Sequence, residues 1–255
     1  MPPAPKPPQT RLYVDFPFTQ GMEIFITEKQ GHYLTHVLRR KLKDRVCVFN
    51  GRDGEWLTEI ILAERKKIGL KLLEQLRPQK PLPDLWLLAA SLRSGKSEWV
   101  VEKATELGIS RFIPVSTQFT VATSVNCNRL TAIAVEAAEQ CERMDIPAID
   151  SLIPLPKLLD GWDSGRKIIY GDESGAGKEP KDLFPKLAPG KYAVLIGPEG
   201  GFAKGELELL RGLDYTAGIS LGPRILRADT AAVAVVTLVQ SQLGDWDNKP
   251  AFRNK

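Results

Sequence analysis

The sequence predicts an α/β fold with a mostly parallel sheet, preceded by a small β-rich domain. Three observations support this prediction. Beyond residue 85, short apolar runs alternate with amphipathic segments, as in βαβ units. Residues 11–77 instead show short strands and turns, and a proline-rich segment, residues 78–84, separates the two regions. With 255 residues, 43% of them hydrophobic, the chain is long enough to bury a core in each domain.

The first domain, residues 11–77, is expected to contain five strands and one helix. Alternation of apolar and polar residues, bounded by turn residues, predicts the strands, and Asn50-Gly51 is typical of a hairpin turn. Residues 31–40 are expected to form a helix, since apolar side chains recur there at helical spacing. The predicted strands span residues 11–14, 23–26, 45–49, 55–62 and 68–73. Residues 1–10 are expected to form a disordered tail.

The second domain is placed at residues 85–245, with residues 246–255 as a tail. Strands are predicted at 85–91, 112–115, 167–170, 192–196 and 217–220, and helices at 98–107, 129–144, 204–212 and 230–243. The last helix is apolar on nearly all sides, so it must be buried by the sheet, by a partner chain or by both.

Composition and cysteine spacing exclude several classes of protein. The longest apolar stretches, residues 85–92 and 231–239, are too short to span a membrane, and the N-terminus lacks the apolar segment of a signal peptide. Cys47, Cys127 and Cys141 are odd in number and widely spaced, which argues against a disulfide framework and against a zinc site. We therefore expect a cytoplasmic protein without a metal ion.

The positive charge is concentrated near the N-terminus. Residues 1–80 contain 15 Lys and Arg against 9 Asp and Glu, whereas residues 81–255 contain 20 against 22. Six of these cations lie within residues 39–52, where Asp44 is the only acidic residue. Such a stretch is suited to phosphate contacts, although a solvated basic face gives the same pattern.

Two segments resemble nucleotide-binding loops but fail on spacing. Ser94-Gly95-Lys96-Ser97 follows a predicted strand, but the first glycine of a Walker A loop, which four residues separate from the G-K-S, would fall on Ala90, inside that strand. Gly177-Lys178 is followed by Glu179 instead of Ser or Thr. An NTPase is therefore disfavoured.

Two glycine-proline loops directly follow predicted strands. The first is Gly197-Pro198-Glu199-Gly200-Gly201, and the second begins at Gly222-Pro223 and leads into Asp229-Thr230, which we expect to cap the final helix. A loop with few side chains allows its backbone to approach a ligand closely. Because crevices of open α/β sheets form beyond the carboxyl ends of strands, the pair predicts a binding site.

At these loops the sequence resembles the RsmE-type 16S rRNA uridine-N3 methyltransferases, which are S-adenosylmethionine-dependent enzymes of the SPOUT superfamily. The two loop motifs, Ile196 to Phe202 and Leu221 to Ala231, are the most specific. Four further stretches match in the family's order along nearly the whole chain: residues 11–14, 36–39, 102–108 and 136–140 with Arg143.

The resemblance implies a PUA-like RNA-binding barrel followed by a SPOUT domain with a deep trefoil knot. It also implies a homodimer that methylates 16S rRNA or the small ribosomal subunit. The cofactor residues implied are Leu195, Gly197, Glu199, Gly200, Gly201, Leu221, Gly222, Ile225, Leu226, Arg227, Thr230 and Ala231. RNA contacts are expected from Arg11, His36, Arg39, Arg40, Lys43 and Arg52.

Transfer of a methyl group from a sulfonium needs alignment of the acceptor nitrogen rather than a metal ion. A cation near uracil O2 or O4 stabilises the anion that forms when N3 loses its proton, and we expect Arg227, or else Arg224, in this role. Glu199 and Asp229 are the candidate bases. The histidines, His32 and His36, are expected to contact RNA or to be packed.

The sequence departs from the family pattern at two places. Asp229 stands where the family usually has Glu, and residues 116–120 lack the arginine of a Ser-Glu-Arg-Ser-like segment. Two alternative functions stay open on the sequence alone. One is a related SPOUT enzyme acting on a ribose or on another RNA, and the other is a catalytically silent RNA-binding protein of ribosome assembly.

Overall fold

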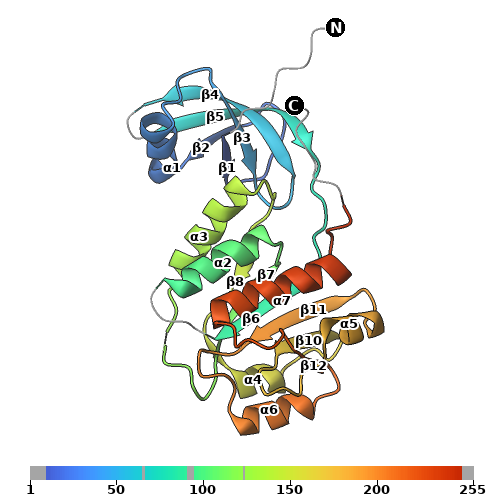
Figure 1. The fold of residues 1–255 in the computed structure, drawn as a ribbon. Coiled ribbons are helices and arrows are strands. Elements are labelled where there is room, and N and C mark those ends of the chain that lie inside the picture. Colours follow the sequence, from blue (N-terminus) through green and yellow to red (C-terminus); the bar gives the residue numbers. More distant parts are fainter. Residues whose placement is uncertain (1–9, 65–66, 91–94, 123, 249–255) are drawn as a thin grey trace. The chain divides into compact units, whose positions relative to one another are not determined.

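The computed structural model describes residues 10–64, 67–90, 95–122 and 124–248 (Figure 1). The described residues form two compact units. Unit 1 comprises residues 10–81 together with residues 138–145, and unit 2 comprises residues 82–137 and 146–248. Of the tail predicted at residues 1–10, the structure describes Thr10, which is buried and accepts hydrogen bonds from Cys47 N and Arg40, so the predicted tail was too long by this residue. Most of the tail predicted at 246–255 lies outside the described residues.

Unit 1 is built on a five-stranded sheet with the order β1-β3-β4-β5-β2. β1 is parallel to β3, and the other neighbours are antiparallel. The strands are β1 (Arg11–Tyr13), β2 (Glu23–Ile26), β3 (Arg45–Phe49), β4 (Glu55–Ala63) and β5 (Ile68–Arg77). Their inward side chains, including Leu12, Val48 and Leu70, form one buried cluster. The strands predicted from alternation are therefore present, and β5 continues four residues beyond the predicted end.

The helix predicted at residues 31–40 begins earlier and is not a regular α-helix throughout. Thr27 and Gln30 form a capping box, which starts α1 (Glu28–His32) at Glu28. The chain continues as a π-helix, η1 (Tyr33–Val37). Gly31 lies against β5, since a Cβ there would be 2.7 Å from Ile68 Cγ1. The predicted boundaries were wrong because the cap, rather than apolar spacing, sets the start of the helix.

Unit 2 contains a seven-stranded sheet within the described residues. Its order is β12-β10-β11-β6-β7-β8, with β9 paired to β7, and every neighbouring pair is parallel. The strands are β6 (Leu85–Ala90), β7 (Arg111–Ser116), β8 (Ala148–Ile149), β9 (Ile153–Pro154), β10 (Arg166–Gly171), β11 (Lys191–Ile196) and β12 (Thr216–Ile219). The prediction of an α/β fold with a mostly parallel sheet is confirmed. β8 and β9 were not predicted because each has only two residues.

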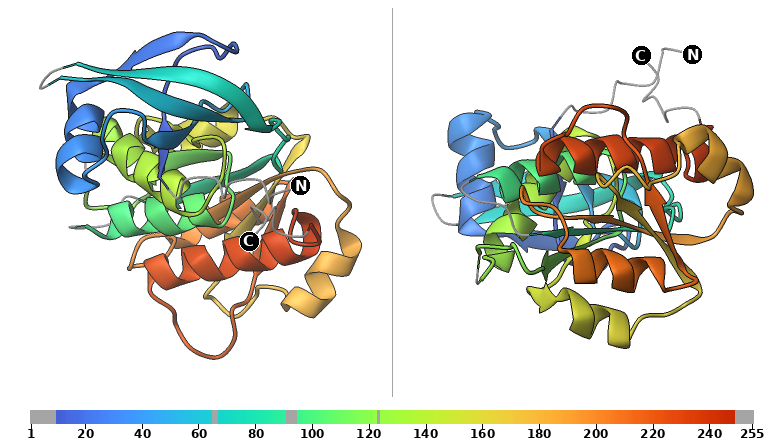
Figure 2. Two further views of the ribbon diagram at one scale, coloured as in Figure 1. Left: turned by 90° about the horizontal axis from the view of Figure 1, so that it is seen from above. Right: turned by 60° about the horizontal axis from the view of Figure 1, so that its bottom comes forward.

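Helices cover both faces of this sheet, as Figure 2 shows. Strand residues such as Val194 join one buried cluster with α2 and α7, and their neighbours such as Leu195 join another with α4 and α6. The helices are α2 (Lys96–Glu106), α3 (Cys127–Gln140), α4 (Leu155–Asp160), α5 (Pro180–Leu183), η2 (Phe184–Lys186), α6 (Lys204–Arg211) and α7 (Ala228–Leu243). No helix among the described residues is both long and apolar enough to span a membrane.

Two predicted helix ends are wrong. α7 begins at Ala228, so Arg227 occupies the N-cap position without a side-chain hydrogen bond, and Asp229 lies in the first turn instead of capping the helix. α3 ends at Gln140 rather than Met144. Glu142 adopts a positive φ of 66°, which a continuing helix does not allow.

Candidate functional site

A pocket of about 300 Å³ lies in unit 2 beyond the carboxyl ends of β10, β11 and β12. These three strands are neighbours, with β10 in the middle, so the loops that follow them meet at one edge of the sheet. Open parallel sheets commonly bind ligands at this edge. The lining residues come from the three loops, residues 171–175, 196–202 and 219–226, and from Ala228 and Ala231 at the start of α7.

The loop after β11 forms the first wall of the pocket. Gly201 N donates a hydrogen bond to Pro198 O at 2.9 Å, and Gly201 has a φ of 69°, which favours glycine. The Phe202 ring packs against Gly197, where a Cβ would lie only 3.2 Å from Cε2 of that ring. The loop is therefore a tight turn whose backbone faces the pocket.

The loop after β12 forms the second wall. Gly222 has a φ of 89°, and a Cβ built there would meet no atom within 4 Å, so this glycine is needed for its backbone conformation rather than for space. Ile225 is 84% exposed even though its side chain is apolar. Both loops that were predicted from the glycine-proline motifs thus line one pocket.

The loop after β10 forms a third wall that sequence reasoning missed. Asp172 is buried there, and its carboxylate accepts hydrogen bonds from Ser174 N and Oγ and from Arg211 of α6. Burial raises the pKa of Asp172, but the bonds from Ser174 and Arg211 outweigh it and hold the pKa below its ordinary value. The signal available in the sequence was Gly171-Asp172-Glu173-Ser174-Gly175, a glycine-rich polar run directly after a predicted strand.

The structure brings most of the predicted cofactor residues together. Those that line the pocket are Gly197, Glu199, Gly201, Leu221, Gly222, Ile225, Leu226 and Ala231, joined by the predicted catalytic residue Arg224.

Leu195, Gly200, Arg227, Asp229 and Thr230 do not line it. The Leu195 side chain is buried in the sheet core, and Gly200 faces Phe119, whose Cβ lies 3.3 Å from the position of a Gly200 Cβ. The Asp229 carboxylate accepts a hydrogen bond from Thr230 N.

Charged groups surround the pocket in a specific pattern. Glu199 pairs with Lys96 of α2 at 3.3 Å, and Asp172 pairs with Arg211 at 3.1 Å. Glu173 and Arg224 also line the pocket. Within the described ranges, no group of three His, Cys, Asp or Glu side chains is placed to hold a metal ion.

The predicted RNA-contacting residues of unit 1 fall into two groups. Arg39, Lys43 and His36 are exposed, and the first two have positive φ values of 53° and 71°. Arg40 donates to Thr10 Oγ1, and Arg52 pairs with Asp15 in an exposed ion pair. His36 stacks on His32 with ring centroids 4.5 Å apart, so both histidines share one exposed face.

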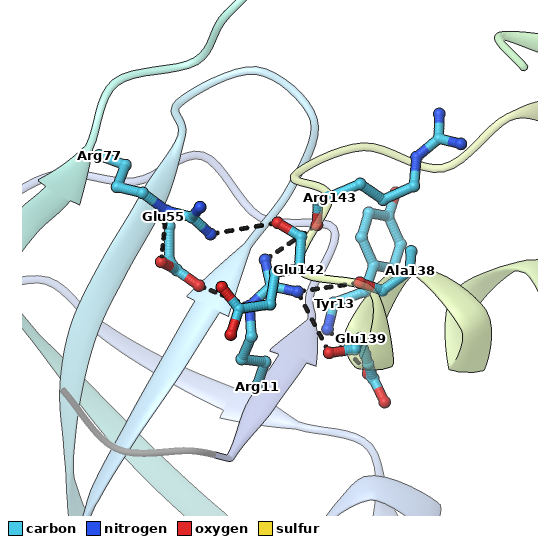
Figure 3. A network of polar contacts seen from close by, with 8 residues as sticks. All are labelled: Arg11, Tyr13, Glu55, Arg77, Ala138, Glu139, Glu142 and Arg143. Carbon is cyan, nitrogen blue, oxygen red and sulfur yellow. Dashed lines mark hydrogen bonds and ion pairs between the residues drawn. The ribbon is translucent and has the colours of Figure 1, made fainter. Parts of the chain in front are cut away.

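Arg11 contradicts the expectation of an RNA contact, because it is buried inside unit 1 (Figure 3). Its Nε lies 2.6 Å from Glu55 Oε1, and both side chains are 1% exposed. The remaining guanidinium nitrogens donate to the carbonyls of Ala138, Glu139 and Arg143. Arg11 thus holds the last turn of α3 and the segment that follows it, and it is not available to a phosphate.

Two family models match the chain. A model described as an RNA methyltransferase domain matches residues 78–240, and one described as an RNA methyltransferase PUA domain matches residues 26–73. Curated proteins named ribosomal RNA small subunit methyltransferase E are similar over most of the chain. The protein from Rickettsia conorii is 34% identical over 234 residues, covering 90% of this chain and 94% of its own, and the one from Bacillus subtilis is 29% identical, covering 85% and 89%.

Solved structures of similar proteins share the fold. A protein from Legionella pneumophila, solved in complex with S-adenosylmethionine, has a TM-score of 0.84 at 26% identity and covers 92% of this chain and 98% of its own. A small subunit methyltransferase E from Neisseria gonorrhoeae, bound to the same molecule, has a TM-score of 0.83 at 22% identity, covering 93% and 99%.

Proposed function

This chain belongs to the RNA methyltransferase family, and we propose that it transfers a methyl group from S-adenosylmethionine to N3 of a uridine in 16S rRNA. The observation that carries the proposal is the pocket formed by three adjacent loops at the carboxyl edge of the sheet. The names of the relatives support small-subunit rRNA as the substrate, and the ligand of the Legionella protein supports the cofactor. The choice of uridine N3 rests on the loop motifs of the sequence.

The pocket residues fit S-adenosylmethionine in size and chemistry. A volume of about 300 Å³ lies at the lower end of the range for small-molecule sites. Ile196, Ile219 and Leu226 offer apolar contacts for an adenine ring, and Gly197 and Gly222 offer backbone groups without side chains. When bound, the cofactor supplies an electrophilic methyl group on a sulfonium.

Arg224 is the cation that we now place nearest the reaction, since it lines the pocket and Arg227 does not. As uracil N3 loses its proton, negative charge spreads onto O2 and O4, and a guanidinium there stabilises it. We propose Glu199 as the proton acceptor because it also lines the pocket, whereas the Asp229 carboxylate is bonded to Thr230 N. Lys96 holds the Glu199 carboxylate in place.

Unit 1 is proposed to bind the RNA backbone. Arg39 and Lys43 are exposed cations, and phosphate contacts of this kind make binding strongly dependent on salt. Because N3 of a paired uridine faces its partner base, the target must be unpaired or extruded before the reaction. The PUA family model over residues 26–73 supports a PUA-like barrel for this unit.

We further propose a deep trefoil knot in unit 2 and a homodimer formed through α7. The order β12-β10-β11 supports the knot, because β10 lies between two strands that follow it in sequence. α7 keeps partly exposed apolar side chains, such as Val233 and Leu238, that a second copy can cover. The three cysteines form no disulfide among the described residues, and this, together with the proposed rRNA substrate, supports a cytoplasmic location.

Transfer of a labelled methyl group to 16S rRNA, followed by nucleoside mapping, tests the proposed function. The substrates are naked rRNA and small subunits from cells that lack this protein. We expect label in 3-methyluridine. Label in a 2′-O-methylated nucleoside would indicate a related enzyme acting on ribose, and no transfer to either substrate would favour an RNA-binding assembly protein.

A further inference from the structure

Three carboxylates line the pocket, and they differ in their partners. Asp172 is paired with Arg211, and Glu199 is paired with Lys96. Across the described parts of the chain, no ion pair or hydrogen bond engages the Glu173 side chain, which is exposed. Among the described residues, Glu173 is therefore the pocket carboxylate without an ion-pair partner, and its negative charge faces whatever occupies the pocket.

The Glu173 side chain reaches from the loop after β10 to the loop after β11. A Cβ on Gly201 would lie 1.7 Å from Glu173 Oε1 and 2.9 Å from its Cδ, so the carboxylate fills the space beside the Gly201 backbone. Both residues line the pocket. A side chain at position 201 would force the carboxylate away, so the glycine allows this charge to sit where two pocket walls meet.

The methyl transfer changes the charge of the cofactor. The bond between sulfur and the methyl carbon breaks, its electron pair stays on sulfur, and the cationic sulfonium becomes a neutral thioether. The methyl carbon forms its new bond to N3, whose proton has passed to the base. A carboxylate that lines the pocket attracts the cationic donor and has no such attraction to the neutral thioether of the product.

We propose that Glu173 determines the preference of this pocket for the sulfonium donor over the thioether product. This inference rests on the proposed function. The carboxylate strengthens binding of S-adenosylmethionine but not of S-adenosylhomocysteine, and so it favours product release after each transfer. Because the Glu173 side chain is exposed, its charge acts in a dielectric close to that of water, where removing one of two unit charges about 3–4 Å apart changes an affinity by about five- to ten-fold.

Calorimetric titration of both cofactor forms into the full chain tests the proposal. Glu173→Gln removes the charge and keeps the shape of the side chain. We expect the Kd for S-adenosylmethionine to rise about five- to ten-fold, while the Kd for S-adenosylhomocysteine changes less than about two-fold. The effect of Glu173→Gln on the Kd for S-adenosylmethionine should become smaller as the salt concentration is raised, because salt screens the charge of the exposed Glu173 side chain.

Two further variants sharpen the test. Glu208→Gln removes the same charge from α6 at a residue that does not line the pocket, so the ratio of the two Kd values should not change. Glu173→Asp keeps the charge and shortens its reach, so the ratio should lie between those of wild type and Glu173→Gln.

An equal loss of affinity for both cofactor forms in Glu173→Gln would overturn the inference, because it would mean that Glu173 contacts a part of the molecule that donor and product have in common. An unchanged ratio would overturn it as well. Neither result touches the proposed function as long as wild type binds S-adenosylmethionine. Failure of the wild-type protein to bind it would instead refute the proposed function itself.

Discussion

Replacing Arg11 by Met should destabilise unit 1 strongly. Arg11 and Glu55 are each 1% exposed and form an ion pair with atoms 2.6 Å apart, and the Arg11 guanidinium also lies 4.5 Å from the Phe49 ring centroid. Methionine retains an apolar side chain of similar length that can pack on Phe49. The variant therefore removes the charge and the hydrogen bonds with little loss of packing.

The size of the expected loss in unfolding free energy depends on the partner that Glu55 retains when Arg11 is replaced. Removing one partner of a buried ion pair costs about 3–5 kcal/mol because it leaves a buried charge. Arg77, whose side chain is 19% exposed, still pairs with Glu55 at 2.8 Å, which places the expected loss near the lower end, about 3 kcal/mol. The carbonyls of Ala138, Glu139 and Arg143 also lose their donor.

Urea denaturation combined with hydrogen exchange measures this effect. In Arg11→Met, the amides of residues 138–145 should lose protection, since their segment loses its link to β1. Arg52→Ala is the matched control. The side chains of Arg52 and of its ion-pair partner Asp15 are 57% and 68% exposed, so this pair should contribute less than about 1 kcal/mol to the free energy of unfolding.

Adding Glu55→Gln to Arg11→Met should recover part of the loss, because the buried Glu55 charge, which Arg77 alone then compensates, is gone. A loss below about 1 kcal/mol in Arg11→Met, equal to that in Arg52→Ala, would refute the structural role of Arg11.

Three other predictions concern the pocket, acid stability and RNA binding. Gly201→Ala should weaken S-adenosylmethionine binding at least about ten-fold in calorimetry, because the φ of Gly201 is 69° and an added Cβ collides with Glu173. Gly205→Ala in α6 is the control, since a Cβ there meets no atom within 4 Å, and it should leave binding unchanged. Burial raises the pKa of Glu55, but Arg11 and Arg77 outweigh it, so its pKa in the folded state lies below the unfolded value of about 4.3. The stability that ionised Glu55 contributes is thus complete above that pH and is lost as the pH falls further. Below about pH 4, the urea midpoint of wild type should therefore decrease more steeply with falling pH than the midpoint of Glu55→Gln. Joint replacement of Arg39 and Lys43 by Ala should reduce the salt dependence of rRNA binding, because two phosphate contacts are lost. In filter-binding assays the steepness of log K against log salt should fall by about 1–2. Lys181→Ala is the control, and an equal fall in this variant would count against a specific basic surface.

The sequence predicted the strands that form the pocket but only two of its three walls. β10, β11 and β12 are short apolar runs, which local patterns identify within one or two residues. The loop at residues 171–175 was not recognised as a pocket wall, because it becomes one only through the position of β10 between β11 and β12. Strand order cannot be read from a local sequence pattern. Once that order is known, three loops at one edge follow directly.

Arg11 shows a second limit of sequence reasoning. In a basic N-terminal region, an arginine is expected at the surface. Its partners are Glu55, 44 residues away, and carbonyls that are 127 to 132 residues away. Only tertiary structure brings these groups together, so the expectation of an RNA contact at Arg11, which came with the resemblance, was wrong: Arg11 is part of the interior.

A crystal structure of the protein with S-adenosylmethionine tests whether the pocket at the carboxyl edge of the sheet binds the cofactor. We expect the cofactor between the loops that follow β10, β11 and β12, in contact with Gly197, Gly222 and the Glu173 carboxylate. Cofactor density at any other place, or these loops closed on one another with the cofactor outside, would contradict it.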